Sequence, residues 1–349
     1  MKFLKVFLLV LAAIIASVVL FFLFLTVTEF YPKENQSIPV EGTAEKKLSL
    51  NTPYRLVTWN TGYGCLGETA DFFMDGGKRV NTATEAETKE NIQAIASFIK
   101  SAQADIILLQ ETDFSSSRSH RINQVEFYAQ NSGGFNFSFA RNFKVHFIPY
   151  PLPPIGKVDS GILTLTRFNI EESTRIPLPC PFKYPVRLCN LKRCLLVSRL
   201  PVSDDTRELV LVNLHLEAYD DGEGKVLQTK VLLDFIKSEN DKGNFVIASG
   251  DFNQTFSSGE QNNDADDDDL WNPGILNRED FNDFDVLFGT EIPTCRSLNK
   301  PYDKSENFRT YIIDGIIVSK NISVTEFKTE NLHFKNTDHN PVLMEFSLR

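Results

Sequence analysis

Residues 245–256, FVIASGDFNQTF, pass from an apolar run directly into polar side chains. The residues from Phe245 to Ala248 predict a strand that is buried in a core. Gly250 then gives the backbone freedom for a tight exit, and Asp251 and Asn253 follow it. The end of this strand is therefore either an ordinary turn or the edge of a functional site, where a carboxylate and a carboxamide face the same space.

The chain from Tyr54 onward alternates short apolar runs with amphipathic segments and shows no internal repeat, which favours one large domain. A helix is predicted over 84–101, with Thr84 and Glu87 as a capping box. A second helix is predicted over 225–237, with Leu227, Val231, Leu232, Phe235 and Ile236 facing inward. Strands are predicted over 55–60, 105–111, 160–167, 194–200, 208–217, 245–250, 311–319 and 342–348. This pattern predicts an α+β fold in which helices cover sheets.

Polar residues recur where these strands end or where apolar packing is expected. In LVLVNLHLE, the alternation of side chains puts Asn213 and His215 on one face. Glu111 ends its strand on the face of Ile107 and Leu109, and Asp314 interrupts an apolar strand. Three further positions carry the same kind of side chain: Asn60 after LVTW, and Asp338 and His339 in TDHNP.

Each of these residues alone has an ordinary interpretation as a turn former, a helix cap or a hydrogen-bonded core residue. Their recurrence at one strand after another favours a shared site. Carboxylates and an amide are the oxygen ligands that Mg²⁺ or Mn²⁺ prefers. An aspartate can accept a proton from water, and a histidine backed by an aspartate can place positive charge on a phosphate. Phosphoryl transfer to water is the chemistry that these residues share.

The ordered motifs TWN, LLQET, NLHL, GDFN, IDGIIVS and TDHNPV resemble those of the endonuclease/exonuclease/phosphatase superfamily. That superfamily includes pancreatic-type deoxyribonucleases, abasic-site endonucleases, neutral sphingomyelinases and inositol-polyphosphate 5-phosphatases. Single motifs are weak, but these stand in the family's order from Asn60 to Pro341. The resemblance implies a four-layer α/β sandwich, in which two facing mixed β-sheets carry outer helices and the active site lies at one edge.

The resemblance also implies a role for each matching position. Glu111 would be the principal ligand of Mg²⁺ or Mn²⁺, with Asn60 and Asp338 completing the metal site. Asp251 would orient and deprotonate the attacking water, and Asn253 would stabilise the transition state. The remaining four residues would act at the scissile phosphate: His339 contacts it, Asp314 holds the His339 ring, and Asn213 and His215 approach it from the other side.

The substrate is a phosphodiester whose class the sequence leaves open. Abasic-site endonucleases tend to have tyrosine in place of His215, which counts against a repair role. The net charge of −10 counts against tight binding of nucleic acid through a basic surface, although Arg118, Arg121, Arg141 and Lys144 are candidates for a phosphate-contacting rim. A nuclease-type or small phosphodiester substrate is expected first, with a sphingomyelinase-like phosphodiesterase of lipid headgroups, or a phosphatase, as the alternative. A non-catalytic tethered module is a remote third, because every expected position is filled.

Two elaborations bear on the lipid alternative. HFIPYPLPPIGK, residues 146–157, is rich in proline and aromatic residues and predicts an irregular lip, which either contacts lipid or packs on the sheets. DADDDD, residues 264–269, is a self-repelling acidic run and predicts a solvated loop.

The N-terminus is a separate element. Residues 1–5 are basic, and residues 6–27 form an apolar run long enough for a helix to cross a bilayer of about 30 Å. The run favours an uncleaved transmembrane anchor over a cleaved signal peptide, since no small-residue cleavage site follows it. Lys2 and Lys5 predict that the N-terminus lies inside and the catalytic domain outside, or secreted if the anchor is cleaved. Residues 28–50 are expected as a linker to a catalytic domain over 51–349, and no obligate protein partner is inferred.

The five cysteines are Cys65, Cys180, Cys189, Cys194 and Cys295. Export permits disulfides, and Cys180 and Cys189 flank a loop where one could form. Cys194 lies in an apolar strand and is expected as a buried thiol. Their spacing resembles no zinc site.

Overall fold

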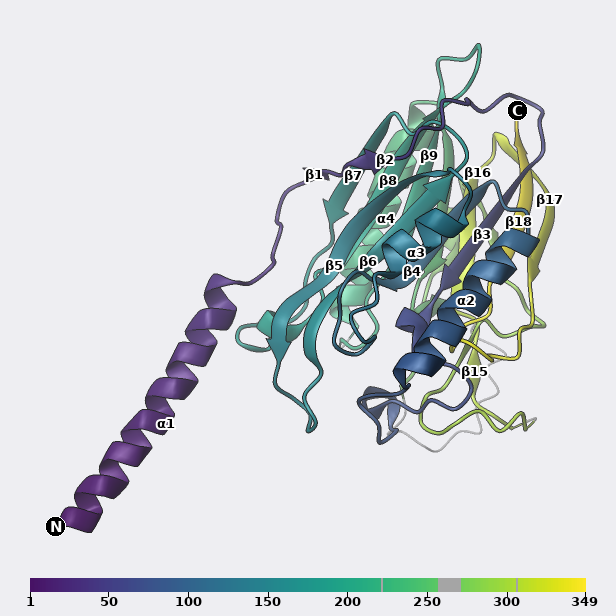
Figure 1. Cartoon of the computed structure of the whole chain (residues 1–349). Coiled ribbons are helices and arrows are strands. Elements are labelled where there is room, and N and C mark those ends of the chain that lie inside the picture. Colours follow the sequence, from purple (N-terminus) through teal and green to yellow (C-terminus); the bar gives the residue numbers. More distant parts are fainter. Residues whose placement is uncertain (221, 257–270, 306) are drawn as a thin grey trace.

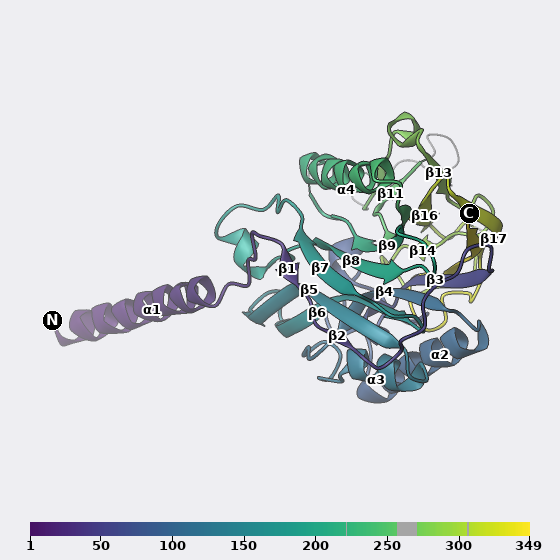
Figure 2. The ribbon, with the colours of Figure 1, turned by 90° about the horizontal axis from the view of Figure 1, so that it is seen from above.

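The computed structural model describes residues 1–220, 222–256, 271–305 and 307–349, and in this part of the chain two seven-stranded sheets face each other. Helix α4 (Glu223–Asp241) lies outside one sheet, and α2 (Glu85–Ser101) and α3 (Gln124–Asn131) lie outside the other (Figure 2). The predicted α+β sandwich of four layers is therefore confirmed. Its acidic loop, residues 264–269, lies outside the described residues.

The first sheet is mixed and has the order β1-β7-β8-β9-β10-β16-β13. The neighbours β8 and β9 are antiparallel, whereas β9 and β10 are parallel. Its strands are β1 (Gln36–Ser37), β7 (Glu172–Pro177), β8 (Cys194–Pro201), β9 (Glu208–His215), β10 (Phe245–Asp251), β13 (Phe284–Leu287) and β16 (Asp314–Ser319).

The second sheet is also mixed and has the order β17-β18-β3-β4-β6-β5-β2. Here β3 and β4 are parallel, and the remaining neighbours are antiparallel. Its strands are β2 (Val40–Glu41), β3 (Tyr54–Asn60), β4 (Ile106–Asp113), β5 (Asn136–Ile148), β6 (Gly156–Thr166), β17 (Ile322–Thr329) and β18 (Val342–Leu348). Two short ribbons pair β11 (Gln254–Thr255) with β12 (Gly274–Ile275) and β14 (Cys295–Arg296) with β15 (Thr310–Tyr311).

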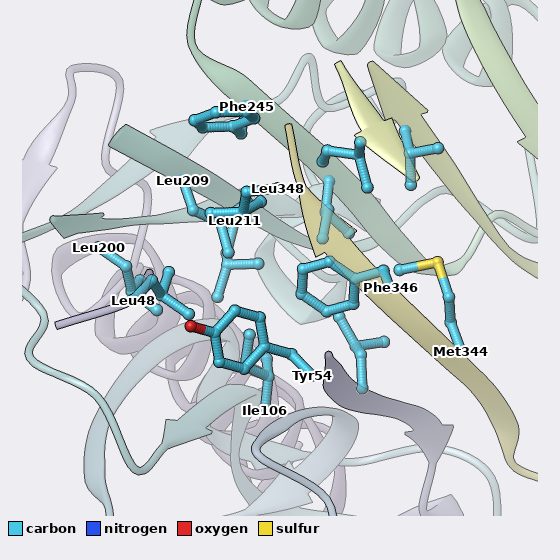
Figure 3. Packing of buried hydrophobic residues seen from close by; sticks show 14 of the residues in the cluster. Leu48, Tyr54, Ile106, Leu200, Leu209, Leu211, Phe245, Met344, Phe346 and Leu348 are labelled. Carbon is cyan, nitrogen blue, oxygen red and sulfur yellow. The ribbon is translucent and has the colours of Figure 1, made fainter. Parts of the chain in front are cut away.

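Alternation along the strands separates the core into layers. Leu209 and Leu211 of β9 belong to the cluster between the sheets, together with Phe245 and Phe346 (Figure 3). Their neighbours in sequence face outward instead, where Val210 and Val212 pack in the cluster that includes Leu232 and Ile236 of α4. Because β9 is apolar on both faces, burial holds it on both sides, which stabilises by about 25 cal/mol per Å² of apolar surface.

The helix predictions are confirmed with one exception. Thr84 accepts from the Glu87 backbone N–H and the Glu87 carboxylate accepts from the Thr84 N–H, which completes the predicted capping box of α2. On α4, Leu232 and Ile236 are buried, but Leu227 is 51% exposed. The prediction that Leu227 faces inward is therefore wrong, because it lies in the first turns of α4 on the side turned away from the sheet.

The N-terminal run forms α1 (Lys2–Val27), a helix long and apolar enough to be a membrane anchor or a signal sequence. It projects from one side of the sandwich (Figure 1). The expectation of a linker over 28–50 needs correction, because β1 pairs with β7 and β2 pairs with β5, while Leu48 is buried between the sheets. The short edge strands β1 and β2 and the buried side chain of Leu48 therefore incorporate this polar segment into the fold.

The possible disulfide is not present. Each of the five cysteines is a free thiol, and Cys194 is buried as expected. The proline-rich lip is less irregular than predicted, since β5 extends to Ile148 and β6 begins at Gly156. The turn between these strands is the irregular part.

Candidate active site

Strand direction brings the polar residues to one edge of the sandwich. In the first sheet, β9 and β10 run in parallel and end at His215 and Asp251. The antiparallel β16 begins where β10 ends, so Asp314 stands directly opposite Asp251. In the second sheet, the same edge receives the ends of β3 and β4 and the start of β18, and with them Asn60, Glu111, Asp338 and His339.

Asp251 lies at the centre of the hydrogen-bonded groups. Its Oδ2 accepts from Asn60 Nδ2 at 2.9 Å and lies 3.4 Å from His215 Nε2 and 3.8 Å from His339 Nε2. Its Oδ1 accepts from the Asn253 backbone N–H at 2.8 Å. These contacts bring side chains from three other segments of the chain around one carboxylate.

The same surroundings shift the pKa of Asp251. Burial, reinforced by the Asp314 carboxylate, raises the pKa of Asp251 to about 7, and His339 and Asn60 oppose the shift. A carboxyl group with a pKa near neutrality suits a general base, because it can be ionised and still take up a proton.

His339 is held by an aspartate behind it. Its Nδ1 lies 2.8 Å from Asp314 Oδ2, and both side chains are buried. Burial alone would lower the pKa of His339, but the Asp314 carboxylate and, to a smaller extent, the Cys295 side chain together raise that pKa well above its usual value. The ring is therefore a cation at neutral pH, with its Nε2 directed toward Asp251.

The turn after β10 has a strained backbone. Gly250 has φ +149°, and a Cβ there would collide with the Leu214 carbonyl oxygen of the adjacent strand. Asn253 has φ +50°, and its Nδ2 donates to the Leu216 carbonyl at 2.9 Å. Because Asn tolerates this left-handed region better than most residues, the turn fixes the carboxamide beside Asp251. Phe252 meanwhile packs in the core under α4.

Glu111 reaches the site through a bulge. The pairing of β4 with β6 shifts register between Leu109 and Thr112, and Glu111 has φ +51°. Ile107 and Leu109 pack under α2, so simple alternation would not have brought Glu111 to the cavity. The face assigned from period-two geometry is corrected by this bulge, which turns the carboxylate to within 4.0 Å of His215.

The donor set near Glu111 fits a hard divalent cation. Burial raises the pKa of Glu111 and of Asp338 above the usual range, although neighbouring cationic side chains oppose both shifts. A Cβ on Gly62 would lie 2.8 Å from Asp338 Oδ1, so glycine keeps this space open. Gly62 also donates its N–H to Asn60 Oδ1 at 3.0 Å, which leaves that amide oxygen one lone pair. Two carboxylates and an amide oxygen are donors of the kind that Mg²⁺ or Mn²⁺ prefers.

Two groups of acidic, His and Cys side chains also have potential ligand atoms within 4.8 Å of one another. These are Cys295 with Asp338 and His339, and Asp251 with Asp314 and His339. Both include His339, whose Nδ1 is already hydrogen-bonded to Asp314. A thiol is a softer ligand than Mg²⁺ or Mn²⁺ prefers, so the oxygen set around Glu111 is the better candidate.

His215 and Asn213 are not equivalent, although they share a face of β9. Burial lowers the pKa of His215 well below its usual value, so the ring is neutral beside Asp251. Asn213 is fully buried. Its Oδ1 accepts from Gln110 Nε2, and its Nδ2 donates to the carbonyls of Leu109 and Leu163. Asn213 does not line the cavity, so a direct contact with the substrate phosphate does not fit its position, and it joins the two sheets beneath the site instead.

A cavity of about 520 Å³ lies over these groups. It is lined by predicted residues from both sheets: Asn60, Glu111, His215, Asp251, Asn253, Asp338 and His339. Asp314 stands behind His339. The cavity also contains a pair that sequence reasoning missed, Arg193 and Glu217, whose Nε and Oε2 are 3.7 Å apart with both side chains buried. Nε and Nη1 of Arg193 have no hydrogen-bond partner among the described residues. A lone arginine before a strand gives no sequence signal for this role.

Comparison with known proteins shows the family of this chain. The sequence model described as the Endonuclease/Exonuclease/phosphatase family matches residues 57–325, whereas no curated protein matches the sequence. An endonuclease/exonuclease/phosphatase from Beutenbergia cavernae DSM 12333 is similar, with 16% identity and a TM-score of 0.58 over 85% of this chain and 72% of that one. One from Bacteroides vulgatus has 16% identity and a TM-score of 0.53 over 86% of this chain and 100% of that one. D. rerio TDP2, complexed with single strand DNA product, has 14% identity and a TM-score of 0.53 over 85% and 100%. At these identities the structures are similar to this chain in fold alone.

Proposed function

The chain belongs to the endonuclease/exonuclease/phosphatase family, and from this premise we propose that it hydrolyses a phosphodiester bond with the help of a divalent cation. The observation that carries the proposal is the convergence of Asp251, His339 and Glu111 on one cavity. We assign the first as the base, the second as a cation and the third as a metal ligand, and the surroundings of each support its role.

Glu111, Asp338 and Asn60 would hold the cation, and Mg²⁺ or Mn²⁺ matches their oxygen donors. When bound, the cation supplies positive charge to the phosphate oxygens and makes a bound water more acidic. The family commonly uses divalent metals, which supports this assignment.

Asp251 would accept the proton of the attacking water through Oδ2, and Asn60, which donates to that oxygen, would orient it. The protonated Nε2 of His339 would face a phosphate oxygen and stabilise the negative charge that develops there. Asp314 would keep His339 charged, and Asn253 would donate to the same phosphate. Asn213, in this proposal, acts only by positioning the strands.

Neutral His215 and the buried guanidinium of Arg193 would approach the phosphate from the β9 side. Arg193 retains donors without hydrogen-bond partners among the described residues, so a phosphate oxygen would satisfy a group that the protein leaves unsatisfied. This arrangement supports a substrate with at least one anionic phosphate oxygen in the cavity.

A nuclease-type or small phosphodiester remains the broad substrate proposal, and TDP2 with its single strand DNA product is an example with the same fold. Two of the arginines considered for a nucleic-acid rim are already paired: Arg118 with Asp113 at 3.0 Å and Arg141 with Asp159 at 2.7 Å. A lipid headgroup is the second candidate, favoured by the apolar residues that line the other half of the cavity.

We place α1 in the membrane as an uncleaved anchor, with the N-terminus inside and the catalytic domain outside. The length of α1 and the two lysines at its start support this orientation. The intact mass of the membrane-bound protein and its digestion by protease from either side test it. A chain that has lost residues 1–27, or a catalytic domain protected on the outside, would contradict it.

A soluble chromogenic phosphodiester, bis(p-nitrophenyl) phosphate, tests the reaction. We expect hydrolysis in Mg²⁺ or Mn²⁺, loss of it in excess chelator, and restoration when the cation is returned. His339→Ala serves as the inactive blank, and His146→Ala, an exposed histidine on β5, serves as the matched control. Full activity in excess chelator would refute the metal assignment.

A further inference from the structure

The cavity has two chemically distinct halves. One is the charged floor that carries Asp251 and His339, and the other is apolar and includes Phe143, Ile148, Tyr150 and Ile155 from the β5–β6 hairpin. The apolar half ends on Phe22, a residue of α1. A side chain of the N-terminal helix therefore lines the same cavity as the candidate catalytic groups.

The last turns of α1 are fixed against this hairpin. Leu25 is buried in a cluster with Val145, Ile148 and Leu188, and the Phe21 ring packs edge-on to Phe147 with centroids 6.3 Å apart. Beyond the helix, the Glu29 carboxylate accepts two hydrogen bonds from Arg187 at 3.1 and 3.2 Å. These contacts set where the helix leaves the domain, at the rim of the cavity.

Exposed apolar side chains gather at the same rim. Tyr150 from the β5–β6 turn and Val186 from the segment before β8 both line the cavity and are 72% and 59% exposed. Two residues from them in sequence, Leu152 and Tyr184 are also exposed. Contiguous exposed apolar residues mark an interaction surface, whereas isolated ones are ordinary. We call Phe147, Tyr150, Leu152, Tyr184 and Val186 the mouth rim.

The length of α1 relates the mouth rim to a bilayer. A helix of 26 residues is about 39 Å long and the hydrocarbon core is about 30 Å thick, so its C-terminal turns emerge at the membrane surface. Those turns are the ones that contact the hairpin, and α1 runs to the side toward which the β5–β6 turn points (Figure 1). Tyrosine and phenylalanine at this level suit the interfacial layer of lipid.

We propose that the mouth rim sits in the membrane interface, so that the cavity opens onto the bilayer and its substrate is the phosphodiester of a membrane phospholipid. This inference rests on the proposed phosphodiesterase function. The phosphate lies on the charged floor, and the apolar half, closed by Phe22, takes the chain-bearing part of the lipid. Water oxygen bonds to phosphorus, one phosphorus–oxygen ester bond breaks, and the departing alkoxide takes a proton, which gives a phosphomonoester and an alcohol.

Two substrates given to the full-length protein in Mg²⁺ separate this inference from the function on which it rests. Bis(p-nitrophenyl) phosphate reports the reaction alone, and unilamellar vesicles of phosphatidylcholine and sphingomyelin report the reaction at a membrane. The protein is incorporated into the vesicles through α1. We expect both to be hydrolysed, and single-stranded DNA to be hydrolysed more slowly than the lipids. Loss of both hydrolyses would refute the function, whereas loss of lipid hydrolysis alone would refute only the inference.

The double variant Leu152→Asp/Tyr184→Asp tests the mouth rim, since both residues are exposed and neither lines the cavity. We expect the ratio of lipid to soluble hydrolysis to fall about tenfold or more, because two apolar anchors are replaced by charges that lipid excludes. The control is Leu227→Asp on α4, an equally apolar exposed position at a different surface, which leaves the ratio unchanged. An unchanged ratio in the double variant, an equal fall in the control, or faster hydrolysis of DNA than of lipid would overturn the proposal.

Discussion

Two groups of buried charges lie at opposite ends of the first sheet, and they are built differently. Where β9 and β10 begin, Glu239 accepts from Arg199 at 2.7 Å, and also from Lys242 and Asn244. Burial alone would raise the pKa of Glu239, but these donors together lower it to about 2. Where the same strands end, burial prevails and raises the pKa of Asp251 to about 7.

The opposite pKa shifts distinguish an end of the sheet that stabilises the fold from the end that carries the candidate active site. The chain supplies its own cations to Glu239, so that carboxylate is ionised and stabilises the fold. Glu111 has no such partner, since the one basic group within 4.0 Å of its carboxylate, in the described part of the chain, is the neutral ring of His215. Cations such as Arg118 lie near enough to oppose the rise in its pKa, but they do not cancel it. A divalent cation from solution would neutralise the carboxylates at this end, as Arg199 neutralises Glu239 at the other.

The largest expected effect is that of Asp251→Asn. The change keeps the shape of the side chain and removes the base, so kcat should fall by about 10²–10⁴-fold. Hydrolysis of a soluble phosphodiester measures it, and Asp285→Asn at an exposed carboxylate of β13 is the control. Turnover within a factor of a few of the wild type would remove Asp251 from the mechanism.

Glu111→Gln should come next. A carboxylate ligand becomes a neutral amide, so the concentration of Mg²⁺ or Mn²⁺ that gives half-maximal hydrolysis should rise by at least about 100-fold. Glu345→Gln, at a carboxylate paired with Arg55 on the far side of the second sheet, should leave that concentration unchanged. An unaltered metal dependence in Glu111→Gln would assign the ligand role elsewhere.

Asp314→Asn should have a smaller effect with a distinctive pH profile. The pKa of His339 is raised by Asp314, so the ring stays protonated below that raised value and loses its charge above it. Removing the carboxylate lowers the pKa, and the alkaline limb of kcat/KM should move to lower pH, with a loss of about 10–100-fold at neutral pH. The same loss at every pH would indicate that Asp314 has only a structural role.

Glu239→Gln should affect stability and leave the reaction mechanism intact. The pKa of Glu239 is lowered in the folded state to about 2 from an unfolded value of about 4.3, so its contribution is complete above about pH 4.3 and is lost as pH falls toward 2. At pH 7 the variant should lose about 1–3 kcal/mol, and its stability should depend less on pH over that window. Denaturant unfolding between pH 2 and 7 compares it with the wild type, and an unchanged pH dependence would contradict the assignment.

The sequence predicted the parts of the site that depend on strand order. Asp251 and His339 follow or precede apolar strands, and parallel and antiparallel neighbours necessarily bring such ends to one edge. The fold class followed from the same alternation. Residues whose position depends on local backbone geometry could not be placed from the sequence. Residue type alone does not indicate the bulge at Glu111 or the burial of Asn213 between the sheets.

Tertiary contacts explain the other differences. Residues 28–50 are polar enough to suggest a linker, yet short strands at two sheet edges and Leu48 incorporate them. No sequence motif includes Arg193, and its place in the cavity depends on how β8 packs beside β9. The approach of Phe22 to the same cavity depends on where α1 leaves the domain, which composition does not encode.

The most direct test of the account is the melting temperature of the full-length protein in detergent, with and without Mg²⁺ or Mn²⁺, for the wild type, Glu111→Gln and Glu239→Gln. Without a cation, we expect Glu111→Gln to melt at or above the wild type, because it removes a partly buried carboxylate that has no cationic partner, and Glu239→Gln to melt below it. Added cation should raise the melting temperature of the wild type and of Glu239→Gln, and leave Glu111→Gln unchanged. A cation that shifts none of the three, or shifts Glu111→Gln as much as the wild type, would contradict the claim that this end of the sheet is completed by a metal.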